Sequence, residues 1–301
     1  MPSRLDTVPS LPDAALAPLV RAYESAVAAK RRRSILVLVI LLLAVLVAAI
    51  AAEVQPGKLA ANIGRFTDYI GRIFRFDGGV LAGQSVLADV GEWFWGIDKW
   101  LVQLGETLLI AYVGTAIGFA GGFLLCFPAA RNIGRIGWLR FAVKRFLEFC
   151  RTVPELVFAL IFVVAFGLGP LPGVIAIAIH TMGALGKLFQ EVVENIDMKP
   201  VDGTTAAGAT WSETVGFAVV PQVLSNFASY TLLRFEINVR GASVMGFVGA
   251  GGIGQDLIEA IRKFYYADVS AILVLIIATV VVIDLGTERL RHRLLGMERR
   301  R

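Results

Sequence analysis

An uncharged apolar run directly after a basic cluster constrains this chain more than any other feature. Residues 34–52 contain the stretch ILVLVILLLAVLVAAIAA, which follows the basic residues at 30–33. A helix needs about 20 predominantly apolar residues to cross a hydrocarbon layer about 30 Å thick, so this stretch predicts a membrane span. Hydrophobic residues make up 56% of the chain, more than one soluble core normally hides. The chain is therefore expected to fold in a bilayer.

Further apolar segments predict an all-α, polytopic transmembrane helical bundle with about six spans. The third of these segments is short, and an amphipathic approach from Phe141 is expected to extend it as one long helix kinked at Pro154. The predicted spans after the first cover residues 101–127, 153–168, 174–193, 217–248 and 269–285.

Basic residues lie beside the apolar segments and predict their orientation. Residues 131–151 carry six basic side chains and one acid, Glu148, and further arginines follow the last apolar run. Because loops rich in Lys and Arg stay in the cytoplasm, we expect a multi-pass protein of the inner (plasma) membrane with both termini inside. This distribution explains the formal net charge of +5, so the sequence indicates contact with membrane lipid and no nucleic-acid partner.

The same pattern divides the chain into four parts. Residues 1–33 are predicted to be a cytoplasmic lead, and residues 34–100 the first span with an extracytoplasmic connection. The connection ends in a tryptophan-rich cluster suited to the membrane–water boundary. Residues 101–290 form the main transmembrane domain, with its longest inner loop at 194–216, and residues 291–301 form a basic cytoplasmic tail.

The residues do not suggest an enzyme. Two cysteines and two histidines form no recognisable zinc pattern, and the sequence has no phosphate-binding loop that would cradle ATP. The glycines at 249, 251 and 254 formally match a dinucleotide-binding fingerprint, but an apolar span precedes them where a strand would be required. We therefore predict no catalytic residue, no metal and no cofactor bound by this chain.

The inner loop resembles the coupling loop of ATP-binding-cassette (ABC) importer permeases. That loop begins with Glu-Ala-Ala, followed after three residues by Gly and, thirteen positions later, by Pro; here Gly208 and Pro221 keep the spacing. The opening positions depart from the pattern, because the acid is kept but the two alanines are not. The residues that this resemblance assigns to contact with an ATPase are Asp202, Gly203, Thr204, Ala206, Ala207, Gly208, Ala209 and Pro221.

A second resemblance, over about residues 100–290, is to phosphonate-transporter permeases. It rests on the motifs RTVPEL from Arg151, GLGP from Gly167, HTMGALGKLF from His180 and GFVGAGGIG from Gly246. It implies a type I ABC importer permease fold like that of the methionine importer, with transport of phosphonates, and of phosphite or phosphate, by alternating access. It also implies a pair of ATPase subunits carrying ATP and Mg, an extracytoplasmic phosphonate-binding protein, and a second permease copy or paralogue.

Ionisable residues within predicted spans need partners or a water-filled path because their burial in hydrocarbon is costly. The candidates for the substrate path are His180, Arg234, Glu236 and Arg240, of which Glu236 and Arg240 are four residues apart and can pair on one helix face. These residues either only brace the helices or offer favourable charge to a passing oxyanion. The glycines expected to form a sharp turn and close helix contacts at the outer mouth are Gly249, Gly251, Gly252 and Gly254.

Two alternatives remain open from the sequence. One is a permease of the same fold that imports another small solute, such as methionine, phosphite or a sulfonate. The other belongs to a different class, a stand-alone channel or a membrane enzyme, and the absence of paired carboxylates, a Cys/His cluster or a serine elbow argues against the enzyme. Co-purification of an ATPase would separate an importer from a channel.

Overall fold

A computed structural model describes residues 13–298, and every regular element in that range is a helix. The outermost parts of the predicted lead and tail, residues 1–12 and 299–301, lie outside the described residues. The chain divides into two compact units, with the boundary between Thr67 and Asp68.

The first unit contains one long helix, α1 (Asp13–Ala51), which joins the lead and the first predicted span without a break. None of the apolar window in its Val20–Ala51 part is buried by protein. An apolar helix that its own unit leaves exposed is suited to a lipid environment. Helix α2 (Pro56–Ile73) follows, begins in the first unit, and was not predicted from the sequence.

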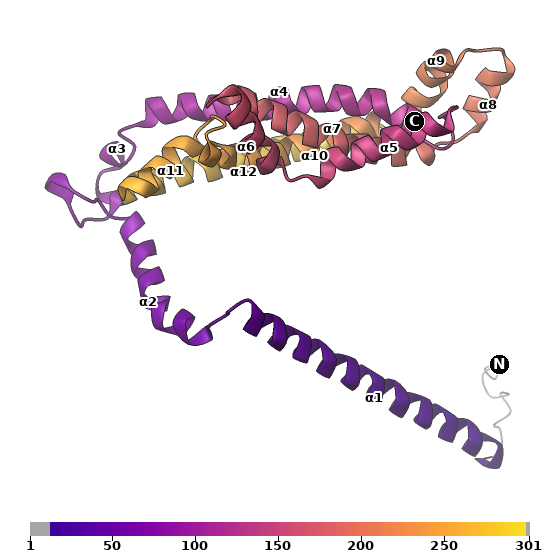
Figure 1. The fold of residues 1–301 in the computed structure, drawn as a ribbon, viewed down its shortest axis with the longest axis horizontal. Helices are drawn as coiled ribbons and strands as arrows, with labels where there is room; N and C mark the ends of the chain where they lie inside the picture. Colours follow the sequence, from indigo (N-terminus) through magenta and orange to yellow (C-terminus); the bar gives the residue numbers. More distant parts are fainter. Residues whose placement is uncertain (1–12, 299–301) are drawn as a thin grey trace, which may run out of the picture. The chain divides into compact units, whose positions relative to one another are not determined.

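The second unit is a helical bundle built on α4 (Ile97–Ala129), α7 (Pro170–Glu194), α10 (Val220–Met245) and α12 (Tyr266–Glu298). These helices run alongside one another in Figure 1. Glycines on α4 allow its backbone to approach α7 closely: a Cβ added at Gly118 would lie 2.6 Å from the Cβ of Thr181. Close backbone approach maximises van der Waals contact, which drives helix association where apolar burial does not.

The prediction of one long kinked helix at Pro154 is wrong. The structure has two helices, α5 (Gly137–Thr152) and α6 (Glu155–Phe166), which meet at an angle of 87°. Proline disfavours the helical conformation of the residue before it, and Val153 is accordingly extended, with φ −73° and ψ 124°. Pro154 therefore separates two helices instead of bending one.

Four described helices are long and apolar enough to cross a membrane, or five if the α5–α6 pair is one span. Helix α10 is 26 residues long but is not among them, because charged residues interrupt its apolar pattern. The described residues therefore show four or five such helices, against about six spans expected from the sequence.

Short elements close the two ends of the bundle (Figure 1). One end carries the short helices η1 (Gly79–Leu81), η2 (Val86–Ala88), α3 (Val90–Trp93), η4 (Gly246–Val248) and α11 (Gly254–Lys263). Tryptophan side chains fix this end, since the indole nitrogen of Trp93 donates to Ser270 Oγ at 3.0 Å and that of Trp95 to Asp268 Oδ1 at 2.9 Å. The other end carries α8 (Lys199–Ala206), α9 (Trp211–Thr214) and the π-helical turn η3 (Val215–Val219).

Candidate functional site

The loop predicted to contact an ATPase forms a compact pair of short helices, α8 and α9. Gly208 lies in the turn between them with φ +85°, a conformation that favours glycine because it has no Cβ. Most of the predicted contact residues are exposed, whereas Thr204 and Ala209 are half-buried. Pro221 is also exposed, at the start of α10. A proline nitrogen cannot donate to the preceding turn, which fits the π-helical turn η3 just before it.

A capping interaction that the sequence analysis missed holds the start of α9. The backbone N–H and the hydroxyl of Thr210 both donate to Glu213 Oε2, each at 2.7 Å. These two bonds lower the pKa of the Glu213 carboxyl below its ordinary range. The Thr-x-x-Glu spacing is the sequence signal that could have identified this cap.

The α8–α9 pair is tied firmly to the bundle. The indole nitrogen of Trp211 donates to the backbone oxygen of Ile133 at 3.1 Å, in the segment between α4 and α5. Val201 of α8 belongs to the same buried cluster as Phe189 and Phe227, whose stacked rings have centroids 3.9 Å apart. A displacement of the α8–α9 pair therefore acts directly on α4, α7 and α10.

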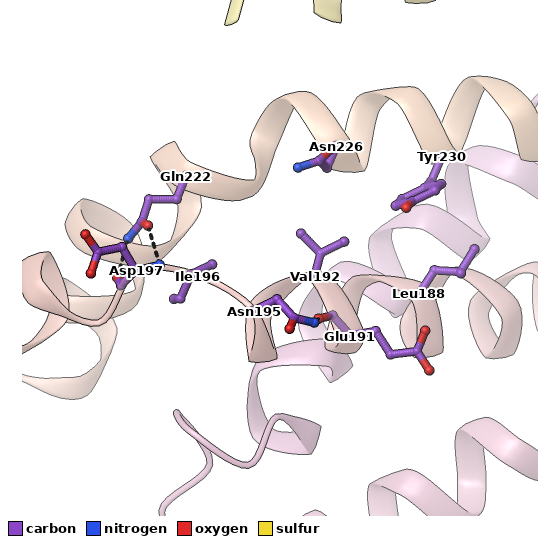
Figure 2. Close-up of a pocket in the computed structure, with 9 residues that line it drawn as sticks. All are labelled: Leu188, Glu191, Val192, Asn195, Ile196, Asp197, Gln222, Asn226 and Tyr230. Carbon is purple, nitrogen blue, oxygen red and sulfur yellow. Dashed lines mark hydrogen bonds between the residues drawn. The ribbon is translucent and has the colours of Figure 1, made fainter. Parts of the chain in front are cut away.

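A side-chain amide closes the base of the loop, as Figure 2 shows. Gln222 Oε1 accepts from the backbone N–H of Asp197 at 3.1 Å, and its Nε2 donates to the Asp197 backbone oxygen at 3.2 Å. The clamp joins the segment after α7 to the start of α10. It borders an open groove of about 510 Å³ between the ends of these helices.

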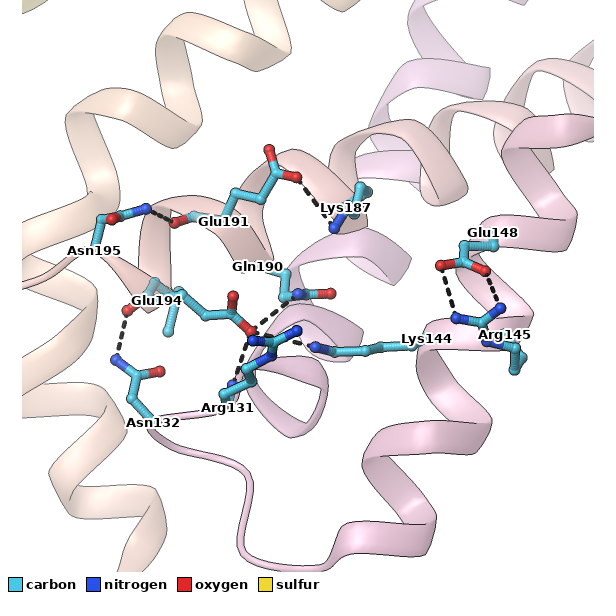
Figure 3. A network of polar contacts seen from close by, with 11 residues as sticks. Arg131, Asn132, Lys144, Arg145, Glu148, Lys187, Gln190, Glu191, Glu194 and Asn195 are labelled. Atoms are coloured by element: carbon cyan, nitrogen blue, oxygen red, sulfur yellow. Dashed lines mark hydrogen bonds and ion pairs between the residues drawn. The ribbon is translucent and has the colours of Figure 1, made fainter.

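A single carboxylate, Glu194, connects three elements at this end of the bundle (Figure 3). Its Oε1 accepts from the Arg131 backbone N–H at 2.9 Å and from Gln190 Nε2 at 3.0 Å, and it pairs with Lys144 Nζ at 3.3 Å. Asn132 Nδ2 donates to the backbone oxygen of Val193 at 2.8 Å. Lys144, one of the basic residues used to predict orientation, therefore also links α5 to α7.

The structure brings two of the four substrate-path candidates together near the middle of the bundle. Arg234 on α10 hydrogen-bonds through Nη2 to His180 Nδ1 on α7. Glu155, the first residue of α6, places Oε2 3.6 Å from the same nitrogen. Sequence reasoning missed Glu155, although an acid directly after Pro154 and before an apolar run was a usable signal.

A buried amide lies one helical turn from Arg234. Asn238 Nδ2 donates to Thr115 Oγ1 at 2.8 Å and to Thr181 Oγ1 at 2.9 Å, so it links α10 to α4 and α7. All three side chains are buried. Hydrogen bonds between buried polar side chains stabilise helix contacts in a membrane, so this network fixes the three helices around the central cluster.

The other two candidates, Glu236 and Arg240, form a separate cluster. They pair on α10 as predicted, and Arg240 Nη2 also lies 3.1 Å from both carboxylate oxygens of Asp284 on α12. Among the described residues, no hydrogen bond or ion pair joins this cluster to Arg234 and His180. Asp284 was missed because its partner is 44 residues away and no helical spacing relates them.

The glycine segment lies at the α3–α11 end. Gly249, Gly251 and Gly252 have φ between +78° and +86°, whereas Gly254 does not. A Cβ added at Gly251 would lie 2.9 Å from Pro170 Cα, so close packing as well as the turn requires glycine. A helix precedes this segment and no strand occurs in the described range, which excludes the structural context of a dinucleotide site. Residues 13–298 also contain no group of three potential metal ligands.

Comparison with known proteins places the chain in a family. The family described as "Binding-protein-dependent transport system inner membrane component" matches residues 121–295, more than half of the chain. The "Phosphite transport system permease protein PtxC" of Stutzerimonas stutzeri is 41% identical over 204 residues, covering 68% of this chain and 73% of the relative. The "Putative cryptic phosphonate transport system permease protein PhnE2" of Escherichia coli (strain K12) is 50% identical over 117 residues, which cover 39% of this chain and 96% of that protein.

Solved structures show the same fold. The inward-facing MetNI methionine ABC transporter matches with a TM-score of 0.57 at 19% identity, covering 65% of this chain and 95% of that chain. A bacterial ABC transporter that imports the acidic polysaccharide alginate matches with a TM-score of 0.55 at 14% identity, covering 81% and 95%. At these identities the likeness concerns the fold, a type I ABC importer permease.

The family model, the relatives and the fold agree with the helical bundle. The named relatives are transport permeases, not enzymes, and members of this family act with an ATPase and a binding protein. The chain belongs to the binding-protein-dependent transport system inner membrane components: it is the membrane-spanning permease subunit of an ABC importer.

Proposed function

We propose that this permease imports phosphonates or the related oxyanions phosphite and phosphate. The observation that carries the proposal is Arg234, a half-buried guanidinium near the middle of α10 whose Nε is buried without a hydrogen-bond partner. Arginine binds phosphonate-type oxygens through short, charge-assisted hydrogen bonds. Relatives named as phosphite, phosphate-import and phosphonate permeases support the same substrate class.

The α8–α9 pair is proposed to seat in a groove of the partner ATPase, where ATP and Mg are bound. Its exposed position and the small residues around Gly208 support this role. Binding of ATP by two such subunits would move the α8–α9 pair and re-orient the helices between inward- and outward-open states. The ligand can bias that equilibrium only by binding the two states with different affinity.

Further parts of the proposal concern assembly and orientation. The permease pairs with a second copy of itself or a paralogue, and both termini face the cytoplasm. His180 and Arg234 lie on the substrate path, and Glu236 and Arg240 form a second charged cluster on the same path. The glycines from Gly249 to Gly254 form the turn at the outer mouth.

Reconstitution tests the substrate class. The permease is combined in proteoliposomes with candidate ATPases and binding proteins, and ATP-dependent uptake of methylphosphonate, phosphite and phosphate is compared with uptake of methionine and ethanesulfonate. We expect uptake and stimulated ATP hydrolysis for the phosphorus oxyanions alone. Uptake of methionine or the sulfonate without any phosphorus oxyanion would favour the other small-solute importer, and ATP-independent flux would indicate a channel.

A further inference from the structure

Two side chains of opposite charge converge on one nitrogen atom, His180 Nδ1. Arg234 Nη2 hydrogen-bonds to it, and Glu155 Oε2 lies 3.6 Å from it. A guanidinium has donors only, so Nδ1 must act as the acceptor and the imidazole proton must lie on Nε2. An unprotonated Nδ1 cannot donate to Glu155. Nδ1 can therefore accept a hydrogen bond from Arg234 when unprotonated or donate one to Glu155 when protonated, but it cannot do both at once.

The cluster contains unused hydrogen-bonding capacity. Glu155 Oε2 and Arg234 Nε are both buried and have no hydrogen-bond partner. The side chains of Glu155 and His180 nevertheless keep 23% and 19% of their exposure, so the cluster can be reached from outside the chain. A buried polar atom without a partner costs free energy, which another arrangement of the same groups can recover.

Gly241 of α10 leaves room for the Glu155 carboxylate. A Cβ added at Gly241 would lie 2.5 Å from Glu155 Oε1, so a larger residue there would make the carboxylate shift. The other oxygen, Oε2, lies 3.6 Å from His180 Nδ1. Glu155 thus acts through His180 and is a positioning residue rather than a direct ligand of Arg234.

Few other charged groups surround the imidazole. Helix α6 contributes Glu155 and α10 contributes Arg234, while α5 presents the backbone of Arg151, whose side chain is exposed. Helix α4 faces this part of α7 with Thr115 and Gly118, which do not ionise. The protonation of His180 is therefore governed by one acid and one base.

We propose that an arriving oxyanion displaces His180 as the partner of Arg234, and that the freed Nδ1 then binds a proton and donates a hydrogen bond to the Glu155 carboxylate. This inference rests on the proposed function. One N–H bond forms at Nδ1 with a proton from solvent, Nε2 keeps its own proton, and no other bond changes. A doubly charged phosphonate then adds one net negative charge to the cluster instead of two. Loss of that proton makes Nδ1 an acceptor again. It then competes with the anion for the hydrogen bond from Arg234, and the anion is released.

The histidine count makes a direct test available. The chain has two histidines, and His292→Asn leaves His180 as the only one. Permease labelled with ¹⁵N-histidine is assembled with unlabelled ATPase and binding protein in lipid bilayers, with methylphosphonate as the probe. Solid-state NMR is expected to show Nδ1 changing from an unprotonated acceptor to a protonated donor when ³¹P signals show bound methylphosphonate. An unchanged Nδ1 signal in a preparation that imports methylphosphonate would overturn the inference.

Substitutions separate positioning from a structural role. Glu155→Gln keeps the shape but removes the charge that stabilises a proton on Nδ1, so the ligand-induced signal should disappear and uptake should fall roughly tenfold. Glu148→Gln, a half-buried acid on α5 that pairs with Arg145, is the matched control and should leave both unchanged. A Glu155→Gln permease that keeps the ligand-induced signal contradicts the inference alone. A wild-type permease that imports no phosphorus oxyanion instead contradicts the proposed function, and the inference with it.

Discussion

At the scale of single residues, the central charges matter because hydrocarbon is a poor solvent for them. Arg234 contacts His180, whereas Arg240 is paired with two carboxylates, Glu236 and Asp284. The positive charge of Arg240 is offset by two nearby carboxylates, which disfavours binding of a further anion, whereas Arg234 keeps a buried Nε without a hydrogen-bond partner. The two arginines on one helix are therefore expected to differ in function.

The first prediction compares Arg234 with an arginine outside the path. Arg234→Gln should lower methylphosphonate uptake by roughly tenfold to a hundredfold, because a hydrogen bond to a charged group contributes about 1.5–3 kcal/mol. The complex should still assemble, since glutamine can hydrogen-bond to His180. Arg145→Gln on α5, which breaks an exposed pair with Glu148, is the control and should transport normally. Equal uptake by Arg234→Gln and wild type would remove Arg234 from the path.

The second prediction compares substitutions at two glycines of the α8–α9 pair, Gly208 and Gly203. Gly208→Ala forces a Cβ into a left-handed conformation and should destabilise the loop by about 1–2 kcal/mol. Gly203→Ala lies within α8 with open space around it, and should stabilise that helix by about 0.5–1 kcal/mol. Thermal unfolding of the purified complex checks the opposite signs. Loss of stability in both variants would show that the left-handed conformation of Gly208 is not the cause of the destabilisation by Gly208→Ala.

At the scale of elements, α8 and α9 are too short to be stable alone and depend on their anchors. Trp211, Val201 and the Gln222 clamp attach them to three different parts of the bundle. Short helices gain most of their stability from such packing, so the pair should move as one body with the ends of α7 and α10.

The capping interaction of α9 gives a pH-dependent prediction. Because hydrogen bonds from the Thr210 hydroxyl and N–H lower the pKa of Glu213, its stabilising effect is complete above the ordinary pKa of 4.5 and is lost as the pH falls through the lowered value. Hydrogen exchange of the α9 amides should therefore show less protection, relative to α8, at acid pH. Glu213→Gln should remove this difference between pH values, whereas exposed Asp202→Asn should leave it in place.

The sequence predicted those elements whose apolar residues continue for a full span, such as α4, α7 and α12. It failed at Pro154, where the choice between a kink and two helices depends on what packs against each side of the break. It also missed Asp284, which meets Arg240 only through a tertiary contact between helices, and Glu155, whose place directly after Pro154 and before an apolar run was a usable signal. Gly208 and Pro221 were identifiable from their spacing, while the Gln222 clamp to the Asp197 backbone leaves no pattern in the sequence.

At the scale of the whole molecule, one chain leaves charged groups uncovered. Arg240 and Asp284 keep 46% and 38% of their side-chain exposure, although both belong to long helices of the bundle. Charged side chains in membrane helices face protein or water rather than lipid. The face formed by α10 and α12 at these residues is thus better suited to a second permease chain or a water-filled path than to hydrocarbon.

The last prediction follows from that exposed face. Native mass measurement of the complex in lipid nanodiscs should find two permease chains with two ATPase subunits, and cysteines placed at Ala207 should crosslink to the ATPase. Ala207 is suitable because it is exposed in the turn between α8 and α9. A cysteine at Val80, exposed at the opposite end of the bundle, is the control and should not crosslink. A functional complex with one permease chain would exclude pairing, and an active complex in which Ala207→Cys never reaches the ATPase would exclude the α8–α9 pair as the contact.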